Sequence, residues 1–184
     1  MSDTAHSIDW MSPEQYLLHE QTAPCKSEYV NGVLYAMAGT SDRHNLIAGD
    51  LFARLLAGTK PPCQVFFADI KVRVRREVQS NFYYPDIVVA CTPGELDSYY
   101  RDFPVFICEV LSPSTERIDR TEKFDAYRSL PSLQEYLLVH QDLRRAEVFR
   151  RRTGWRQEVL KAGDTIALES LGIEVPLADV YARL

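Results

Sequence analysis

Two acidic residues lie in apolar runs that are typical of buried β-strands. Asp86 follows Tyr84-Pro85 and precedes Ile87-Val88-Val89. Glu109 lies within the apolar run from Val105 to Leu111. A buried carboxylate is costly unless an opposite charge accompanies it, and hard cations such as Mg²⁺ and Mn²⁺ prefer carboxylate oxygens. If the two strands are neighbours, these acids predict a Mg²⁺ or Mn²⁺ site.

Lys123 adds a cation to this pair of acids. Hydrolysis of a phosphodiester needs a metal ion that neutralises developing charge, an activated water and a cation near the phosphate. We expect Asp86 and Glu109 to bind the metal ion, helped by the main-chain carbonyl of Val110. We expect Lys123 to orient the water or to contact the phosphate. Each residue also has an ordinary alternative, because Pro-Asp is common in turns and most helix lysines are solvated.

Four further residues could reach the same cleft in supporting roles. Glu28 opens a predicted hairpin, and His44 lies at the start of a predicted helix. Asp69 interrupts an apolar run, and Asp119 lies one helical turn before Lys123. The alternative for Asp119 is a helix cap, because a glutamate three residues later gives it the spacing of a capping box.

Local patterns predict the elements that position these residues. Serine followed by proline favours a helix start, Asn-Gly favours a hairpin, and apolar residues at helical or alternating spacing favour helices or strands. The order of elements predicts an α/β domain with a mixed sheet. We expect helices at 12–18, 41–58 and 119–130, strands within 28–37 and at 65–74, 82–91, 104–111, 135–139 and 146–150, a last hairpin of 155–160 and 165–168, and a short helix within 175–184.

Size and charge limit the classes of protein to which this chain can belong. The 184 residues predict one domain spanning 1–184, and 46% of them are hydrophobic. A net charge of −5 argues against indiscriminate binding to the nucleic-acid backbone. Basic residues nevertheless cluster at 71–76 and at 144–152, so a local positive patch could still bind a specific target.

The cysteines and the termini indicate a cytoplasmic protein. Cys25, Cys63, Cys91 and Cys108 form no C-x-x-C pair, and we expect all four to be reduced and structural, with no zinc site. No apolar run approaches the roughly 20 residues of a membrane helix, and no export signal is visible.

Several segments taken together resemble the Uma-type family, a bacterial group within the PD-(D/E)XK nuclease superfamily. The resemblance extends from Glu28 to about Arg150, which would form the core of the domain. It implies a restriction-endonuclease-like fold with a central mixed sheet flanked by helices. The segments that carry it are 28–32 (EYVNG), 41–45 (SDRHN), 84–89 (YPDIVV), 109–115 (EVLSPST), 119–124 (DRTEKF) and 131–136 (PSLQEY).

The resemblance also implies roles for individual residues. It makes Pro85-Asp86 the PD element and Glu109 the second acid. The superfamily lysine belongs two positions after that acid, where this chain has Leu111. Either Lys123 supplies the amine from the following helix, or catalysis is lost.

These observations predict a Mg²⁺- or Mn²⁺-dependent endonuclease that acts on DNA. Three alternatives stay open: a non-catalytic nucleic-acid-binding module, a hydrolase of RNA or another phosphorylated substrate, and a structural dimer whose acids pair with internal lysine or arginine. A homodimer would supply the two active sites that cleavage of both strands of a duplex requires. Specificity would come from loops such as 95–102.

Overall fold

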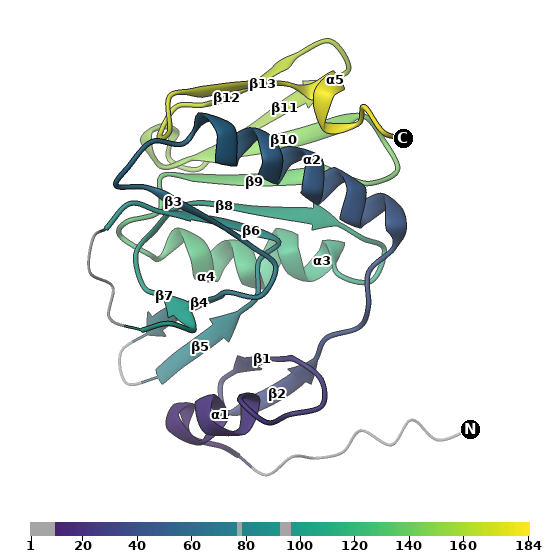
Figure 1. Cartoon of the computed structure of the whole chain (residues 1–184). Coiled ribbons are helices and arrows are strands. Elements are labelled where there is room, and N and C mark those ends of the chain that lie inside the picture. Colours follow the sequence, from purple (N-terminus) through teal and green to yellow (C-terminus); the bar gives the residue numbers. More distant parts are fainter. Residues whose placement is uncertain (1–9, 77–78, 93–96) are drawn as a thin grey trace.

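The computed structural model describes residues 10–76, 79–92 and 97–184. Its centre is a six-stranded sheet of β3 (Gln64–Phe67), β6 (Ile87–Ala90), β8 (Pro104–Leu111), β9 (Glu135–His140), β10 (Arg145–Arg150) and β11 (Gln157–Lys161) (Figure 1). The strand order is β11-β10-β9-β8-β6-β3. β8 and β9 pair in parallel, and the other neighbours pair antiparallel. The predicted α/β class with a mixed central sheet is therefore confirmed.

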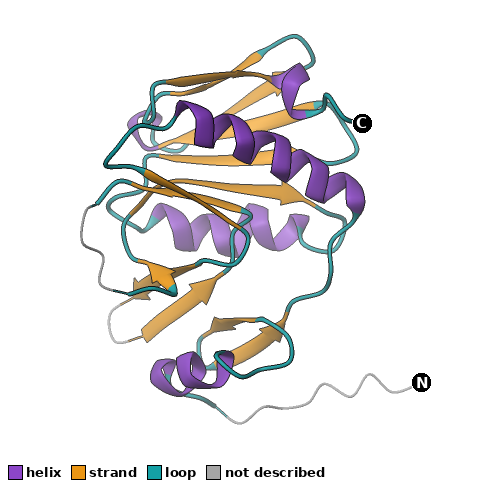
Figure 2. Cartoon of the chain, viewed as in Figure 1, coloured by secondary structure: helices purple, strands orange, loops and turns teal. Residues whose placement is uncertain are grey.

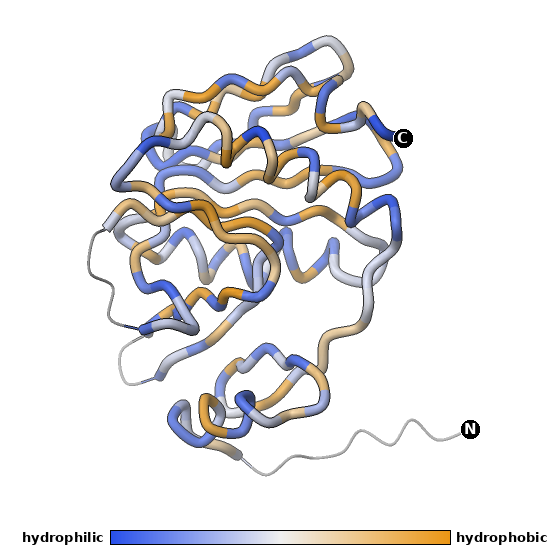
Figure 3. The backbone as a smooth tube through the Cα atoms, in the orientation of Figure 1, coloured by the Kyte–Doolittle hydropathy of each residue, from blue (hydrophilic) through white to orange (hydrophobic). Residues whose placement is uncertain are grey.

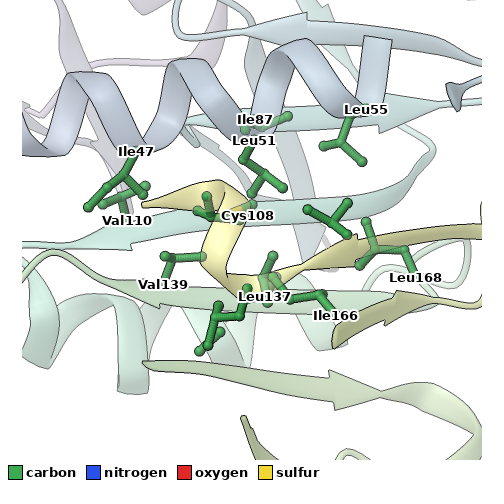
Figure 4. Packing of buried hydrophobic residues seen from close by; sticks show 14 of the residues in the cluster. Ile47, Leu51, Leu55, Ile87, Cys108, Val110, Leu137, Val139, Ile166 and Leu168 are labelled. Carbon is green, nitrogen blue, oxygen red and sulfur yellow. The ribbon is translucent and has the colours of Figure 1, made fainter. Parts of the chain in front are cut away.

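Helices cover both faces of the central sheet (Figure 2). One face carries α2 (Asp42–Gly58), whose Ile47, Leu51 and Leu55 lie one turn apart and pack against Cys108 and Val110 of β8 (Figure 4). The opposite face carries a helical segment composed of α3 (Glu116–Ile118), the π-helix η1 (Asp119–Lys123) and α4 (Phe124–Arg128). Figure 3 shows strongly hydrophobic stretches along the central strands, between these two helical layers.

The side chains of β8 alternate between the two faces of the sheet, so each packs against one of the two helical layers. Cys108 and Val110 belong to the apolar cluster under α2, whereas Ile107 and Leu111 belong to the cluster under α4. Because successive side chains of a strand point to opposite faces, Glu109 lies on the same face as α3, η1 and α4.

A second sheet has the strand order β2-β1-β5-β4-β7. Tyr16, Tyr29 and Phe82 form its own apolar cluster with the first helix. The elements are α1 (Pro13–Glu20), β1 (Ser27–Val30), β2 (Val33–Ala36), β4 (Lys71–Arg76), β5 (Gln79–Tyr83) and β7 (Tyr100–Arg101). A small C-terminal unit consists of β12 (Thr165–Leu168), β13 (Ile173–Pro176) and α5 (Leu177–Val180), after the short 3-10 helix η2 (Arg151–Thr153).

Two of the crossovers that carry the chain between the large sheets interrupt segments that the sequence predicts as single strands. The prediction of one continuous strand over 65–74 and another over 82–91 is therefore wrong. The first breaks at Ala68, whose φ is +58°, and the second breaks between β5 and β6 at Tyr84-Pro85-Asp86. The amide of Ala68 donates to the carbonyl of Asp86 at 3.0 Å, so the two crossovers lie side by side. Apolar residues flank both breaks, so the periodicity did not reveal them, although Tyr84 and Pro85 at the second break are buried and Phe67 and Asp69 at the first are exposed.

Three further element predictions need correction. The helix after β8 begins at Glu116 instead of Asp119, because the chain turns at Ser112 through Thr115. The last hairpin does not form, since β11 pairs with β10 and β12 pairs with β13. The C-terminal helix is limited to Leu177–Val180, because residues 173–176 form β13, a strand that the sequence patterns missed.

Cys63 and Cys91 form a disulfide, so the prediction that all four cysteines are reduced is wrong. In the antiparallel pairing of β3 and β6, Gln64 lies opposite Ala90. Each cysteine is the next residue outward, and the two therefore face each other across the strands. Cys25 is exposed and Cys108 is buried, and both are free. Within the described ranges, no helix is long and apolar enough to cross a membrane.

Candidate active site

Asp86 and Glu109 lie on neighbouring strands of the central sheet. Asp86 immediately precedes β6, and Ile87 pairs with Cys108 of β8. The amide of Val110 donates to Asp86 Oδ2 at 2.7 Å, which holds the carboxylate against β8. Asp86 therefore lies at the boundary between the two sheets, while Glu109 is buried inside β8 with 4% of its surface exposed.

Lys123 brings three carboxylates together. Its Nζ atom lies 2.9 Å from Glu28 Oε1, 3.2 Å from Glu109 Oε1 and 3.4 Å from Asp119 Oδ1. Asp119 and Lys123 are the first and last residues of η1, four positions apart, so they lie on the same side of the helical segment. We refer to Glu28, Asp86, Glu109, Asp119 and Lys123 as the acid cluster.

Two tyrosines connect the acid cluster to its supporting elements. The hydroxyl of Tyr127 in α4 donates to Glu109 Oε1 at 3.0 Å. The amide of Tyr84 donates to Glu28 Oε1 at 3.0 Å, which joins β1 to the crossover that carries Asp86. Sequence analysis missed Tyr127, although its position one helical turn after Lys123 could have indicated it.

His44 contacts the cluster from the start of α2. Ser41 caps this helix by accepting a hydrogen bond from the His44 amide at 3.2 Å, and His44 Nε2 lies 3.2 Å from Asp86 Oδ2. Burial lowers the pKa of His44, but the adjacent Asp86, the Val110 carbonyl and the charge of Asp119 raise it more, so that it lies above its ordinary value. The imidazole is thus held as a cation beside Asp86 in weakly acidic solution.

The acid cluster contains four carboxylates and one ammonium, and burial and the neighbouring charges shift the pKa values of Glu109, Asp119 and Lys123. Burial raises the pKa of Glu109 well above its ordinary value, against the opposing charge of Lys123, and Asp119, Asp86 and Glu28 raise it further. Burial also raises the pKa of Asp119. Burial disfavours the Lys123 ammonium, yet Glu109, Glu28 and Asp119 together raise the pKa of this amine well above its usual range.

The chemistry of these donors fits a hard divalent cation. Four carboxylates face one ammonium and one imidazole, and Asp119 Oδ1 is buried without a hydrogen-bond partner in the described part of the chain. Oxygen ligands with surplus negative charge are those that Mg²⁺ and Mn²⁺ prefer. Among the residues that the structure describes, no three histidine, cysteine or acidic side chains already form a metal cage. Lys123 lies between the acids instead.

A family comparison identifies the group to which this chain belongs. Residues 13–178 match the family Uma2, described as "Putative restriction endonuclease". The chain belongs to the Uma2 family. Two uncharacterized proteins of Synechocystis are similar to it: one is 33% identical over 95% of this chain and 93% of its own length, and the other is 34% identical over 82% and 85%.

A solved structure shares the fold of this Uma2 protein. It is the crystal structure of "a putative nuclease belonging to DUF820" from Anabaena variabilis. The two chains superimpose with a TM-score of 0.75 at 18% identity, covering 94% of this chain and 98% of the other. At this identity, the comparison establishes the nuclease-like fold.

The structure does not place every predicted residue of this Uma2 protein in the cluster. Asp69 lies in the exposed turn after β3, where it forms an ion pair with Lys26. Asp69 does not reach the acid cluster, because the chain turns at Ala68 instead of continuing as a strand. The main-chain carbonyl of Val110 lies near enough to the His44 imidazole to raise its pKa. Of the predicted specificity loop 95–102, residues 95–96 lie outside the described ranges.

Proposed function

We propose that this Uma2 protein is a Mg²⁺- or Mn²⁺-dependent endonuclease that hydrolyses DNA phosphodiester bonds. The observation that carries the proposal is the convergence of Glu28, Glu109 and Asp119 on Lys123, with Asp86 held against Val110, the residue that follows Glu109 in β8. Membership of a family described as restriction endonucleases supports the same reaction class.

Each residue of the cluster has a distinct role in this proposal. Asp86 and Glu109 hold the metal ion, with the Val110 carbonyl as a further oxygen ligand. When bound, the metal ion supplies positive charge to the phosphate and lowers the pKa of a coordinated water. Lys123 donates hydrogen bonds that orient the water or bind a phosphate oxygen. His44 fixes the orientation of Asp86 through the contact of 3.2 Å.

Lys123 replaces the lysine that the superfamily pattern places two positions after the second acid. Leu111 occupies that position and is buried in the apolar cluster under α4. The side chains at 109 and 111 point to the same face of β8. Lys123 approaches this face from η1 and lies 3.2 Å from Glu109, so the amine is supplied by a different element but meets the same acid.

Metal binding and DNA cleavage test the proposal. Asp86→Asn and Glu109→Gln should each abolish Mn²⁺ binding in calorimetry. Each should also lower the Mg²⁺- or Mn²⁺-dependent cleavage rate by more than about 100-fold, because loss of even a residue that only supports a metal ligand lowers metal affinity or activity about 10- to 100-fold. Lys123→Met should lower the cleavage rate comparably. Asp69→Asn is the matched control, because it neutralises an exposed acid outside the cluster, and it should leave both properties unchanged.

Two results would contradict the endonuclease. One is a wild-type protein that leaves linear, supercoiled and single-stranded DNA intact with either metal. The other is cleavage that Asp86→Asn does not alter. If DNA binding survives both acid substitutions without any metal, a non-catalytic binding module is supported instead, and Leu111 at the lysine position is the observation that favours it.

A further inference from the structure

Lys71 is the second buried lysine of this protein, and it lies outside the acid cluster. It begins β4 and has only 6% of its surface exposed. Within the described residues, its ammonium forms no hydrogen bond or ion pair. Its Nζ atom instead lies 5.0 Å from the ring centre of Tyr84 and 5.9 Å from that of Tyr99.

The charged groups around Lys71 do not supply the missing partner. Burial lowers the pKa of Lys71, and Lys26 lowers it further, whereas Glu20 and Asp97 raise it from a longer range. Glu20 accepts hydrogen bonds from the Ser27 amide and the Tyr84 hydroxyl, and Asp97 accepts one from the Tyr99 amide. Lys26 forms an ion pair with Asp69.

Aromatic rings alone are weak compensation for a buried ammonium. A cation–π contact contributes about 1 to 2 kcal/mol when it is desolvated, whereas removing the ammonium from water costs several kcal/mol. An anion that enters beside the rings would pair with this charge. Tyr99 forms the open side of the site, because 58% of its surface is exposed.

The location relates Lys71 to the acid cluster. Tyr84 lies two residues before Asp86, and its amide binds Glu28 of the cluster. Lys71 follows the crossover at Ala68, which is hydrogen-bonded to Asp86. Side-chain alternation places Lys71 on the face of the second sheet that α1 covers and Glu28 on the opposite face, so a polymeric substrate would reach Lys71 from the acid cluster by passing around the crossover at Tyr84.

We propose that Lys71, Tyr84 and Tyr99 form a nucleotide-binding subsite for a nucleic-acid strand. The Lys71 ammonium binds a phosphate, and the exposed ring of Tyr99 stacks on the attached base. The identity of the anion rests on the proposed endonuclease function, whereas the need for an anion rests on the burial and surroundings of Lys71. The subsite extends the substrate path from the acid cluster along the crossover to β4.

Oligonucleotide binding without divalent metal tests the subsite. The probe is a short fluorescein-labelled single-stranded oligodeoxynucleotide, measured by anisotropy in EDTA. Lys71→Met should weaken binding about tenfold and reduce the slope of log K against log salt by about 0.7, the value for one phosphate contact on a single strand. Lys161→Met removes an exposed lysine from β11 and should change affinity less than twofold. Equal affinities of the two variants would overturn the subsite.

A second variant protects the test against misfolding. Tyr99→Leu changes an exposed side chain and should weaken binding at least fivefold, since stacking on an aromatic ring contributes about 1 to 3 kcal/mol per base. Lys71→Met should melt at the wild-type temperature or above it. Wild-type affinity of Tyr99→Leu, or a clearly lower melting temperature of Lys71→Met, would assign these residues a structural role.

Cleavage assays separate this inference from the proposed function. If the wild type cleaves DNA and Lys71→Met binds and cleaves equally well, the subsite is wrong and the endonuclease stands. If binding depends on Lys71 but neither metal supports cleavage, the subsite stands and the endonuclease is wrong. A wild type that binds no oligonucleotide would overturn the subsite directly.

Discussion

Lys123 and Lys71 are buried to the same degree and have opposite surroundings. Each has 6% of its surface exposed. Three carboxylates lie within 3.4 Å of Lys123 and raise its pKa, whereas Lys71 contacts two aromatic rings and has a lowered pKa. Burial alone therefore does not fix the charge state of a lysine, because the neighbouring charges decide it.

The two sites also differ in the charge of the ligand that each would bind. The acid cluster has surplus negative charge, which suits a divalent cation. The Lys71 ammonium forms no ion pair within the described structure, with the charges of Glu20 and Asp97 at longer range, and the proposed ligand there is an anion. In the proposed nuclease, the metal ion would offset the charge of the carboxylates, and Lys71 would attract a phosphate of the same strand. The crossover of Tyr84 through Asp86 connects the two sites.

The largest expected difference between the two lysines is the change in the free energy of unfolding when each amine is removed. Lys123→Met leaves three carboxylates buried without their shared cation, and we expect a loss of about 3 to 5 kcal/mol in the free energy of unfolding at neutral pH. Urea denaturation measures this loss. It should shrink in acidic solution, where the carboxylates are protonated. A loss below about 1 kcal/mol at neutral pH would mean that the acids are solvated or accompanied by another cation.

Glu147 is a buried carboxylate whose hydrogen-bond partners outweigh the effect of burial on its pKa, in contrast to Glu109. Burial opposes its ionisation, but hydrogen bonds from Arg120, His140 and Gln157 lower its pKa to about 2. Its stabilising contribution is present above pH 4.5 and is lost as the pH falls toward 2. Glu147→Gln should cost about 2 to 3 kcal/mol at pH 7 and progressively less below pH 4.5.

Acid titration of unfolding measures this contribution, with Glu174→Gln as the control for an exposed acid of β13. Glu109 should behave in the opposite way, because its pKa in the folded state is raised. Protonation of Glu109 therefore favours the folded state as the pH falls toward 4.5. A stability difference for Glu147→Gln that is independent of pH between 7 and 2 would contradict the assignment.

The smallest expected effect is that of Lys71→Met on stability. Since Lys71 is largely buried and forms no hydrogen bond or ion pair within the described structure, removal of its ammonium should leave the free energy of unfolding unchanged or raise it by up to about 1 kcal/mol at pH 7. The unfolded state binds more protons than the folded state between the lowered pKa and 10.5, so wild-type stability rises with pH in this range. The advantage of Lys71→Met should therefore disappear toward pH 10.5.

Short-range patterns were sufficient to predict the starts of the first two helices, the first hairpin and two of the acids of the site. Ser12-Pro13 and Ser41 cap α1 and α2 as expected, and Asn31-Gly32 turns the first hairpin. Asp86 and Glu109 stood out because a carboxylate in an apolar run carries a desolvation cost that its neighbours in the chain already reveal. These features depend on residues a few positions apart in the sequence, so the local sequence contains all the information needed to predict them.

Other features depend on contacts between distant segments. The break at Ala68 removed Asp69 from the site, and the register of β3 with β6 joined Cys63 to Cys91. Glu28, Asp119 and Tyr127 converge on the acid cluster only because β1, η1 and α4 pack around β8. Lys71 looks like an ordinary solvated strand residue until packing surrounds it with rings instead of carboxylates. The charge state of a buried group depends on all of its neighbours in space, and periodicity along the chain does not contain that information.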